Sequence, residues 1–380
     1  MQPKVSVLIP AYNHEKYIGL AIESVLSQTF CDFELLISDD CSPDNTKDVI
    51  KGYNDKRIRT VFFEENQGTV FCLNHLLDIA QGEYIAVLGS DDIWEKDKLE
   101  KQLQVLETNP SLAACFTFAN IIDRKSKKIT VSNAFPLSIF EYDNFPREKM
   151  LCDFFVGGNR LCHSSALIRA SVHREIGGYL PQLRQLHDFD LWIRILLKYP
   201  VYILKENLVG YRFIENTNNI SRASDINNIR LYNEAKFVIE NMFKNISDED
   251  FITAFKNFFI NKNASLPEQL LCEKFFILWD KGLWNSSVKT LGLDFLMDNL
   301  SNEAFCQCMK KDYGYSLNDL YAFTGSFAAN YDSDMHENFS VYKKENVSLK
   351  AELESIYASK AWKLVSMIKK FFNIFRRNHR

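Results

Sequence analysis

The chain has 380 residues, a formal net charge of −4 at pH 7, 46% hydrophobic and 25% charged residues, and nine prolines. This length suffices for two or three domains, and the composition is that of a folded protein. The charge gives no reason to expect nucleic acid as a partner of the whole molecule. It is unevenly spread, because residues 358–380 hold seven Lys or Arg and no acid, which leaves −11 on the rest.

The nine cysteines form neither a disulfide framework nor a metal-binding pattern. None belongs to a CxxC pair, and Cys306 and Cys308 are too closely spaced for a usual zinc knuckle. We therefore expect reduced, mostly buried thiols. No secretory signal follows Met1, and no stretch approaches the roughly 20 apolar residues that span a bilayer, so we expect a cytoplasmic body.

Strand-like and helix-like segments alternate along the first hundred residues. Short apolar runs predict buried strands, and apolar residues at intervals of three and four predict helices. In chain order, the predicted elements are a strand at Val5–Ile9, a helix at Tyr17–Leu26, a strand at Phe33–Ile37, a helix at Thr46–Tyr53, a strand at Ile58–Phe63, a helix at Thr69–Ala80 and a strand at Tyr84–Leu88. The alternation predicts a doubly wound, mostly parallel α/β sheet, whose ligands bind at the carboxyl ends of the strands.

The pattern changes beyond this α/β part. Residues 216–340 are predicted to be mainly helical, for example at Ile229–Phe243, and residues 341–380 to form a helical tail with a basic amphipathic segment. We therefore expect three parts, with the α/β domain at residues 1–215, a helical domain at 216–340 and the tail after it.

Residues suited to binding a ligand, most of them polar, follow each predicted strand at the edge where ligands should bind. In chain order they are Pro10, Tyr12 and Asn13, then Asp39 and Asp40, then Asn66 and Gly68, and finally Ser90, Asp91 and Asp92. Carboxylates bind Mg²⁺ or Mn²⁺, and such a cation neutralises a diphosphate. Glycine-rich phosphate loops of the GxxxxGK[ST] or GxGxxG type are absent from the sequence, so we expect a metal in their place.

In their order and spacing, these segments closely resemble family 2 glycosyltransferases with the GT-A fold. The matching stretches are Val5–Asn13, Ser27–Phe30, Ser38–Thr46, Asn66–Gly68 and Gly82–Asp92. Each is weak alone, but the ordered set continues to about Arg212 and is specific. The resemblance implies an inverting sugar transferase of the bacterial surface-polysaccharide type, of hexosyl or N-acetylhexosaminyl specificity. It also implies a nucleotide-sugar donor and a divalent cation, Mn²⁺ or Mg²⁺.

The resemblance implies roles on the donor side. Pro10, Tyr12 and Asn13 correspond to the first nucleotide-contacting loop, with the Tyr12 ring near the base. Asp40 resembles the aspartate that hydrogen-bonds the pyrimidine, and a carboxylate there favours uracil, whose N3–H is a donor. The alternative interpretation makes Asp39 and Asp40 a simple turn, because Asp before Ser-Pro favours turns.

Three further residues are assigned to the nucleotide-sugar site, namely Asn66, Gly68 and Ser90. For the first two, the alternative is that they shape a turn without touching the ligand.

The metal-binding motif of the family departs from its common form here. Asp91 resembles the metal-ligating aspartate of the DxD motif, but Gly89 stands where many members have the first aspartate. Asp92 either binds the metal as well or organises the loop. The alternative for this acidic pair is the N-terminal cap of a helix running through Lys98.

A later segment resembles the part of the family that supplies the catalytic base. Members often have Glu-Asp where this chain has His187 and Asp188, and we assign the base to Asp188, with Asp190 as the rival carboxylate. Asp188 also stands where a helix containing Trp192 should begin. His163 and His187 are placed on the acceptor side, with a purely structural role as the alternative for His163.

The basic tail suggests a second contact. At residues 358–380, apolar residues recur at helical spacing among Lys and Arg, namely Ala361, Trp362, Val365, Ile368, Phe372 and Phe375. A cationic amphipathic helix of this kind suits an anionic membrane surface, and packing on the acidic body is the alternative. We expect a peripheral location on the cytoplasmic face of the inner membrane, with a glycan or lipid-linked acceptor.

Three competing functions are weighed against sugar transfer. A nucleotidyltransferase would need a glycine-rich basic loop where this chain has Pro10–Asn13. A catalytically silent nucleotide-binding or scaffolding module at the membrane is supported by Gly89 alone. A processive polymer synthase would need transmembrane helices, which the sequence does not predict.

Overall fold

The computed structural model describes residues 2–130, 137–213, 224–282 and 285–326. The chain divides into two compact units, residues 1–317 and 318–380. The first unit contains both the α/β part and the helices through α12. The boundary expected near residue 215 therefore does not coincide with the boundary between the units, and the division into domains stays a prediction. The predicted tail at residues 341–380, with its basic segment at 358–380, lies outside the described residues.

The described strands form one eight-stranded sheet in the order β3-β2-β1-β4-β7-β6-β8-β5. In chain order they are β1 Val5–Ala11, β2 Phe33–Asp39, β3 Ile58–Phe62, β4 Tyr84–Val87, β5 Ile93–Trp94, β6 Ala114–Ile122, β7 Leu167–Arg169 and β8 Val201–Arg212. The β3-β2-β1-β4 half is parallel, as is the β6-β8 pair. Strand β7 runs antiparallel to β4 and β6, and β5 antiparallel to β8. The predicted doubly wound, mostly parallel sheet is confirmed.

In chain order, the described helices are α1 Ile18–Leu26, α2 Thr46–Lys51, α3 Thr69–Ile79, α4 Lys98–Thr108, α5 Arg147–Gly157, α6 Ala170–Ile176, α7 His187–Leu196, α8 Asp225–Asn245, α9 Asp248–Phe255, α10 Pro267–Asp280, α11 Asn285–Asn299, α12 Glu303–Asp312 and α13 Leu317–Ser326. The three helices predicted within the first hundred residues, α1 to α3, begin and end close to their predicted bounds. One alternative from the sequence is wrong: Asp91 and Asp92 do not cap a helix, because the short strand β5 follows them and α4 begins only at Lys98.

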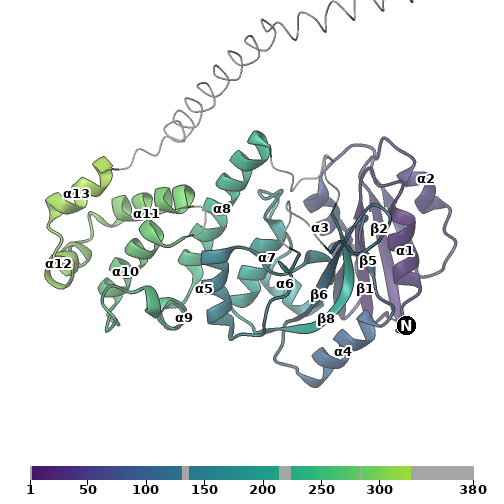
Figure 1. Cartoon of the computed structure of the whole chain (residues 1–380), viewed down its shortest axis with the longest axis horizontal. Coiled ribbons are helices and arrows are strands. Elements are labelled where there is room, and N and C mark those ends of the chain that lie inside the picture. The colour runs from purple at the N-terminus through teal and green to yellow at the C-terminus, as the bar shows by residue number, and fades with distance from the viewer. Residues whose placement is uncertain (1, 131–136, 214–223, 283–284, 327–380) are drawn as a thin grey trace, which may run out of the picture. The chain divides into compact units, whose positions relative to one another are not determined.

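Alternating residues of the central strands bury both faces of the sheet (Figure 1). On one face, Val7 of β1 and Leu35 of β2 pack with α1 and α4. On the other, Leu8 and Leu36 pack with Leu76 of α3. Because side chains alternate across a strand, this pattern requires helices on both sides. The carboxyl ends of β1, β2 and β4 therefore meet at one open edge.

The helices after the sheet share a further hydrophobic cluster with the second half of the sheet. A single cluster of buried apolar residues joins Phe116 of β6 and Phe155 of α5 with Trp192 of α7, Ile239 of α8 and Phe255 of α9. Helices α10–α12 extend from α8 and α9 (Figure 1). Helix α8 is thus packed directly on α7, which positions one side of the site described below.

All nine cysteines are free, and six of them are buried, which confirms the predicted reduced thiols. In the part of the chain that the structure describes, no helix combines the length and the apolar character needed to cross a bilayer.

Candidate active site

The ends of β1 and β2 are fixed to each other by backbone hydrogen bonds. The Asp40 N–H donates to the carbonyl of Ala11 at 2.9 Å, and the Asn13 N–H donates to Ser42 Oγ at 2.9 Å. Asn13 adopts a left-handed φ of 56°, a conformation that Asn tolerates better than most residues. Tyr12 between them is 44% exposed, so its ring is open to a ligand.

The Asp40 carboxylate holds the loop that follows β3. It is buried, and its two oxygens accept from the backbone N–H groups of Gln67 at 2.7 Å and Gly68 at 2.8 Å. Asn66 Nδ2 donates to the Asp40 carbonyl at 3.2 Å, and Gly68 has a φ of +91° that favours glycine. Asn66 and Gly68 therefore shape this turn, while each Asp40 oxygen keeps a lone pair for a further donor.

Asp92 organises the loop after β4. It is buried, one oxygen accepts from the Ser164 hydroxyl, and the other accepts from the Arg212 N–H at 2.8 Å. Burial and the neighbouring charge of Asp91 raise its pKa above the ordinary aspartate range. Both oxygens are thus engaged within the protein, which favours the loop-organising interpretation, and its metal role stays a prediction.

Gly89 is closely surrounded by side chains, so a larger residue there would require its neighbours to shift slightly. A Cβ atom there would lie 3.0 Å from Asp92 Oδ2 and 3.3 Å from both Asp91 Oδ1 and Ser164 Oγ. The Gly89 N–H also donates to Ser164 Oγ at 3.0 Å. The departure from the common DxD form is therefore built into the packing of this loop.

His14 lies against the same loop, a contact that the sequence did not predict. Its Nδ1 shares a hydrogen bond of 2.7 Å with Ser90 Oγ, and its Nε2 lies 3.9 Å from Asp91 Oδ2. The only signal in the sequence was its position directly after Asn13, at the carboxyl end of β1.

Arg212 is a second residue that sequence reasoning missed. Its side chain is buried at the end of β8, and its Nε donates to the Asp91 carbonyl at 2.6 Å. The guanidinium also donates to the Asp123 carbonyl and to Ser126 Oγ, and it lies 4.7 Å from the centre of the Tyr17 ring. Nothing in the local sequence indicates this role, because all of these partners lie at least 86 positions away in the chain.

The donor set around Asp91 fits a small hard cation held together with a diphosphate. In the ranges that the structure describes, no group of three or more His, Cys, Asp or Glu side chains is arranged to hold a metal by itself. The Asp91 side chain is 19% exposed, with His14 as its neighbour. Mg²⁺ in such sites uses one or two carboxylates and takes its other ligands from phosphates and water.

Asp188 lies in the first turn of α7 and is partly buried. Asn159 Nδ2 donates to its Oδ2 at 2.9 Å, and the Phe189 N–H donates to its Oδ1 at 2.7 Å. Burial raises the pKa of Asp188, while nearby His187 and these two hydrogen bonds act in the opposite direction. A carboxylate with a raised pKa that is still accessible is suited to accept a proton. The rival Asp190 is buried and paired with Arg194 at 2.7 Å.

The two histidines assigned to the acceptor side contact each other. The ring centres of His163 and His187 are 5.4 Å apart. His163 Nε2 shares a hydrogen bond of 2.8 Å with the Tyr179 hydroxyl, and burial lowers its pKa well below the ordinary histidine value. His187 Nδ1 lies 3.2 Å from the Arg184 carbonyl. These contacts favour a structural role for His163, and its acceptor-side role stays a prediction; His187 lies directly beside Asp188.

The metal-side and base-side carboxylates influence the same two buried groups electrostatically. Burial, followed by the charges of Asp92, Asp91 and Asp188 among others, raises the pKa of Tyr211. Burial and the charges of Asp92 and Asp188 likewise raise the pKa of Cys162. Residues separated by about a hundred positions in the sequence are thus brought within electrostatic reach of one another.

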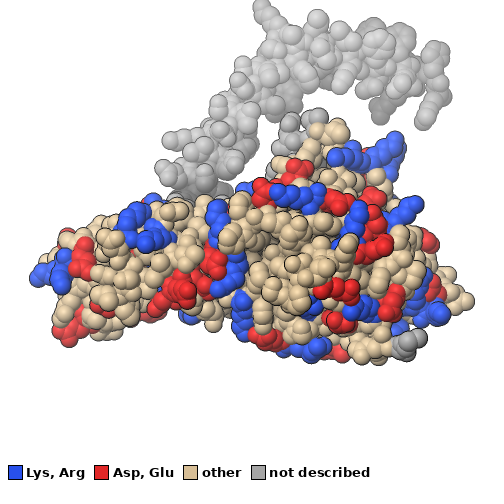
Figure 2. All heavy atoms as spheres, turned by 90° about the horizontal axis from the view of Figure 1, so that it is seen from below, with Lys and Arg blue, Asp and Glu red and all other residues tan. Residues whose placement is uncertain are grey.

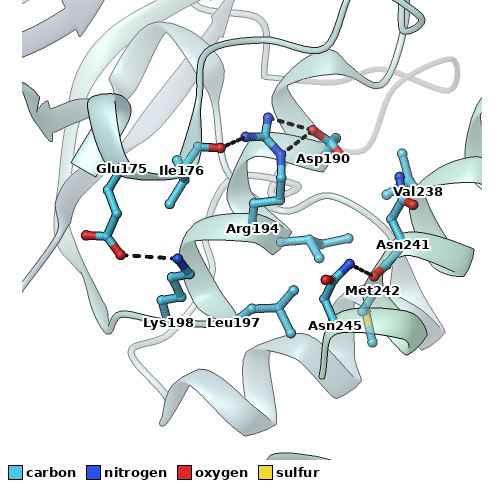
Figure 3. A pocket seen from close by; sticks show the side chains of 11 residues that line it. Glu175, Ile176, Asp190, Arg194, Leu197, Lys198, Val238, Asn241, Met242 and Asn245 are labelled. Atoms are coloured by element: carbon cyan, nitrogen blue, oxygen red, sulfur yellow. Dashed lines mark hydrogen bonds and ion pairs between the residues drawn. The ribbon is translucent and has the colours of Figure 1, made fainter. Parts of the chain in front are cut away.

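A separate cavity of about 440 Å³ lies on the other side of α7, between α6 and α8. Figure 3 shows its charged groups paired with each other, Arg194 with Asp190 and Lys198 with Glu175. It is lined by none of the strand ends, so it is not the donor site.

The comparisons with known proteins agree with this geometry. Residues 6–176 match the sequence model of Glycosyl transferase family 2. The putative teichuronic acid biosynthesis glycosyltransferase TuaG of Bacillus subtilis (strain 168) is 33% identical over 228 residues, which are 57% of this chain and 81% of TuaG. The putative glycosyltransferase EpsE of the same organism is 31% identical over 231 residues, 59% of this chain and 74% of EpsE.

Solved structures support the fold. The S. aureus TarS structure in complex with UDP-GlcNAc superposes with a TM-score of 0.53 and 17% identity, and the match covers 85% of this chain and 91% of that one. At this identity the likeness concerns the fold alone. The family match and the relatives above lead to one conclusion: this chain is a glycosyltransferase and belongs to Glycosyl transferase family 2.

Proposed function

We propose that the chain transfers a sugar from a UDP-sugar to an acceptor hydroxyl with inversion at the anomeric carbon, as a step in surface polysaccharide, lipopolysaccharide or capsule synthesis. The observation that carries the proposal is the partly buried Asp188, oriented by Asn159 and within electrostatic reach of the same tyrosine as Asp91. An inverting transfer requires a cation-binding carboxylate at the diphosphate and a general base at the acceptor, and we assign these roles to Asp91 and Asp188.

In the proposed mechanism, Asp188 removes the acceptor proton as the hydroxyl oxygen attacks the anomeric carbon. The carbon–oxygen bond to the diphosphate breaks as the new bond forms, and the proton stays on the Asp188 carboxyl. Asn159 Nδ2 holds Oδ2 and the Phe189 N–H holds Oδ1, which orients the carboxylate and leaves each oxygen a lone pair for the acceptor hydroxyl. General-base help of this kind contributes roughly 10²- to 10⁴-fold in rate.

On the donor side, Tyr12 and Asp40 bind the base, and Pro10, Asn13 and Ser90 line the nucleotide-sugar site. Asp91 would hold the divalent cation, and Asp92 would bind it as well or organise the loop that carries Asp91. When bound, Mg²⁺ or Mn²⁺ neutralises the charge that develops on the departing diphosphate. Uridine is proposed because the carboxylate of Asp40 accepts from the N3–H of uracil.

The substrate class rests on the relatives. TuaG is named for teichuronic acid biosynthesis, and TarS was solved with UDP-GlcNAc. We therefore favour a UDP-hexose or UDP-N-acetylhexosamine donor and a glycan or lipid-linked acceptor. The basic residues 358–380 would bring the enzyme to the cytoplasmic face of the inner membrane, where such acceptors are assembled.

The second candidate is a silent nucleotide-binding module, and the observation that favours it is Gly89. This chain has glycine where the first DxD carboxylate commonly stands, and a Cβ there would make tight contacts with Asp92, Asp91 and Ser164.

Calorimetric titration with UDP, GDP, CDP and dTDP, each with and without Mn²⁺, tests the donor side. We expect metal-dependent binding of UDP alone. Release of UDP from a panel of UDP-sugars, for the wild type and Asp188→Asn, tests the chemistry. The variant should bind UDP normally and lose roughly 10²- to 10⁴-fold in kcat. Nucleotide binding without turnover by the wild type, across many acceptors, would favour the silent module.

A further inference from the structure

The start of helix α7 is held by a residue from a distant part of the chain. Glu234 of α8 is buried, and its two oxygens accept three backbone N–H groups in succession. Oε1 accepts from Arg184 at 2.9 Å, and Oε2 accepts from Gln185 at 2.7 Å and from Leu186 at 2.8 Å. Helix α7 begins at the next residue, and Asp188 follows Leu186 by two positions.

These hydrogen bonds anchor the segment just before the helix and are distinct from a helix cap, which would accept the N–H groups of the first turn. Leu186 is the N-cap residue of α7, and it has no side-chain oxygen to accept the free N–H groups of the first turn. Asp188 accepts from its neighbour Phe189 and from Asn159, so it does not hold the preceding segment. The three N–H groups before the helix depend instead on one carboxylate 48 to 50 positions away.

Two further attachments of the α7 helix lie farther along it from Asp188. At its middle, Arg194 donates to the carbonyls of Ile176 and Gly178, as Figure 3 shows in part. At its carboxyl end, Arg147 donates to the carbonyls of Leu196 and Leu197. Asn159 holds the Asp188 carboxylate itself, while Glu234 holds the backbone just before it, closer in sequence than the attachments through Arg194 and Arg147.

We propose that Glu234 is a positioning residue for the transfer reaction, which sets the place and direction of Asp188 by holding residues 184–186. The proposal rests on the function proposed above, because it needs Asp188 to be the base. It also gives a role to the helices after the sheet, because α8 lies beyond the residues 6–176 that match the family and yet orients the reacting carboxylate.

Glu234→Gln tests the proposal. Glutamine keeps the size of the side chain but has one acceptor oxygen in place of two, so at least one backbone N–H loses its partner. A displacement of the base by about 1 Å lowers kcat by about 10²-fold, and we expect a loss of about 10- to 100-fold. The affinity for UDP with Mn²⁺, measured by calorimetry, should stay within about twofold, because the described hydrogen-bond partners of Glu234 are residues 184–186, none of which is assigned to the donor side.

Hydrogen exchange gives a second readout that does not depend on the substrate. The amides of residues 184–190 should exchange faster in Glu234→Gln than in the wild type. Glu240→Gln is the matched control, because Glu240 lies on the same helix and its ion pair within the described ranges is with the exposed Lys244. It should change neither kcat nor the exchange of residues 184–190. Glu234→Asp, which keeps the charge but is shorter, should fall between the wild type and Glu234→Gln.

The outcomes separate the two proposals. Turnover is measured with the UDP-sugar that the wild type uses fastest, and Asp188→Asn is assayed alongside. If Asp188→Asn loses turnover while Glu234→Gln keeps wild-type kcat and exchange, Glu234 has no positioning role and the proposed function stands. If Glu234→Gln loses UDP affinity in parallel with kcat, its role is general stability and the proposal is wrong. If Asp188→Asn keeps full turnover, both proposals fail together.

Discussion

At the scale of single residues, the surroundings of Asp188 set the pH at which it can accept a proton. Burial raises its pKa, and the hydrogen bond from Asn159 lowers it. A carboxylate acts as a base only above its pKa, so a raised pKa moves the acid side of the pH–activity curve upward. The acid limb of kcat/KM should therefore lie above the ordinary aspartate pKa of about 3.9.

Asn159→Ala should move that acid limb to still higher pH. The substitution removes the donor that favours the charged carboxylate and leaves the burial that disfavours it, so the pKa of Asp188 rises further. The measurement is kcat/KM against pH for wild type and variant. Asn245→Ala is the control, because its side chain donates only to the Asn241 carbonyl on α8. An unchanged or lower acid limb would show that another group titrates.

His14 should contribute to cation binding beside Asp91. Its Nδ1 is held by Ser90 Oγ, which directs Nε2 toward the carboxylate. Residues that orient a metal ligand commonly contribute about 10- to 100-fold to metal affinity. His14→Ala should therefore weaken Mn²⁺-dependent UDP binding by about that factor, as measured by calorimetry. UDP binding without metal should change little, and an equal loss in both titrations would assign His14 to the nucleotide itself.

At the scale of elements, the sequence predicted those strands and helices that are long enough to show a periodic pattern of apolar residues. The strands β1 to β4, the helices between them and the polar residues at their ends follow from periodicity, because each element buries one face or both. The antiparallel strand β7 has three residues and β5 has two, too few for any periodic pattern to distinguish them. The contacts of Glu234 and Arg212 join residues about 50 to 120 positions apart, and no local pattern encodes such pairs.

The ion pair between α5 and α9 should stabilise the packing around α7. Arg147 donates to Asp250 at 2.6 and 2.9 Å, and the two side chains are 24% and 12% exposed. A double-mutant cycle with Arg147→Met and Asp250→Asn, followed by urea unfolding, should give a coupling energy of about 0.5 to 3 kcal/mol. The same cycle at the exposed pair Lys244 and Glu240 should give at most about 0.5 kcal/mol. Equal coupling in both cycles would contradict a special role for the first pair.

At the scale of the whole molecule, charge is arranged in two ways. On the face shown in Figure 2, acidic and basic side chains alternate over the described residues, without a broad area of one sign. Residues 358–380, by contrast, hold seven Lys or Arg and no acid. An anionic bilayer would therefore be drawn to this segment rather than to that face of the body.

The full chain should bind vesicles of phosphatidylglycerol and phosphatidylcholine but not vesicles of phosphatidylcholine alone, because each basic residue near an anionic surface adds about 1 kcal/mol. Lys369→Gln with Lys370→Gln should then lose about 2 kcal/mol, or roughly 30-fold in vesicle affinity measured by co-sedimentation. Lys310→Gln with Lys311→Gln, at the end of α12, is the matched control and should change little.

Salt should weaken the binding of the wild type, because it screens the attraction. If the basic segment packs on the acidic body instead, the full chain will not sediment with either vesicle, and the double substitution will lower the unfolding temperature.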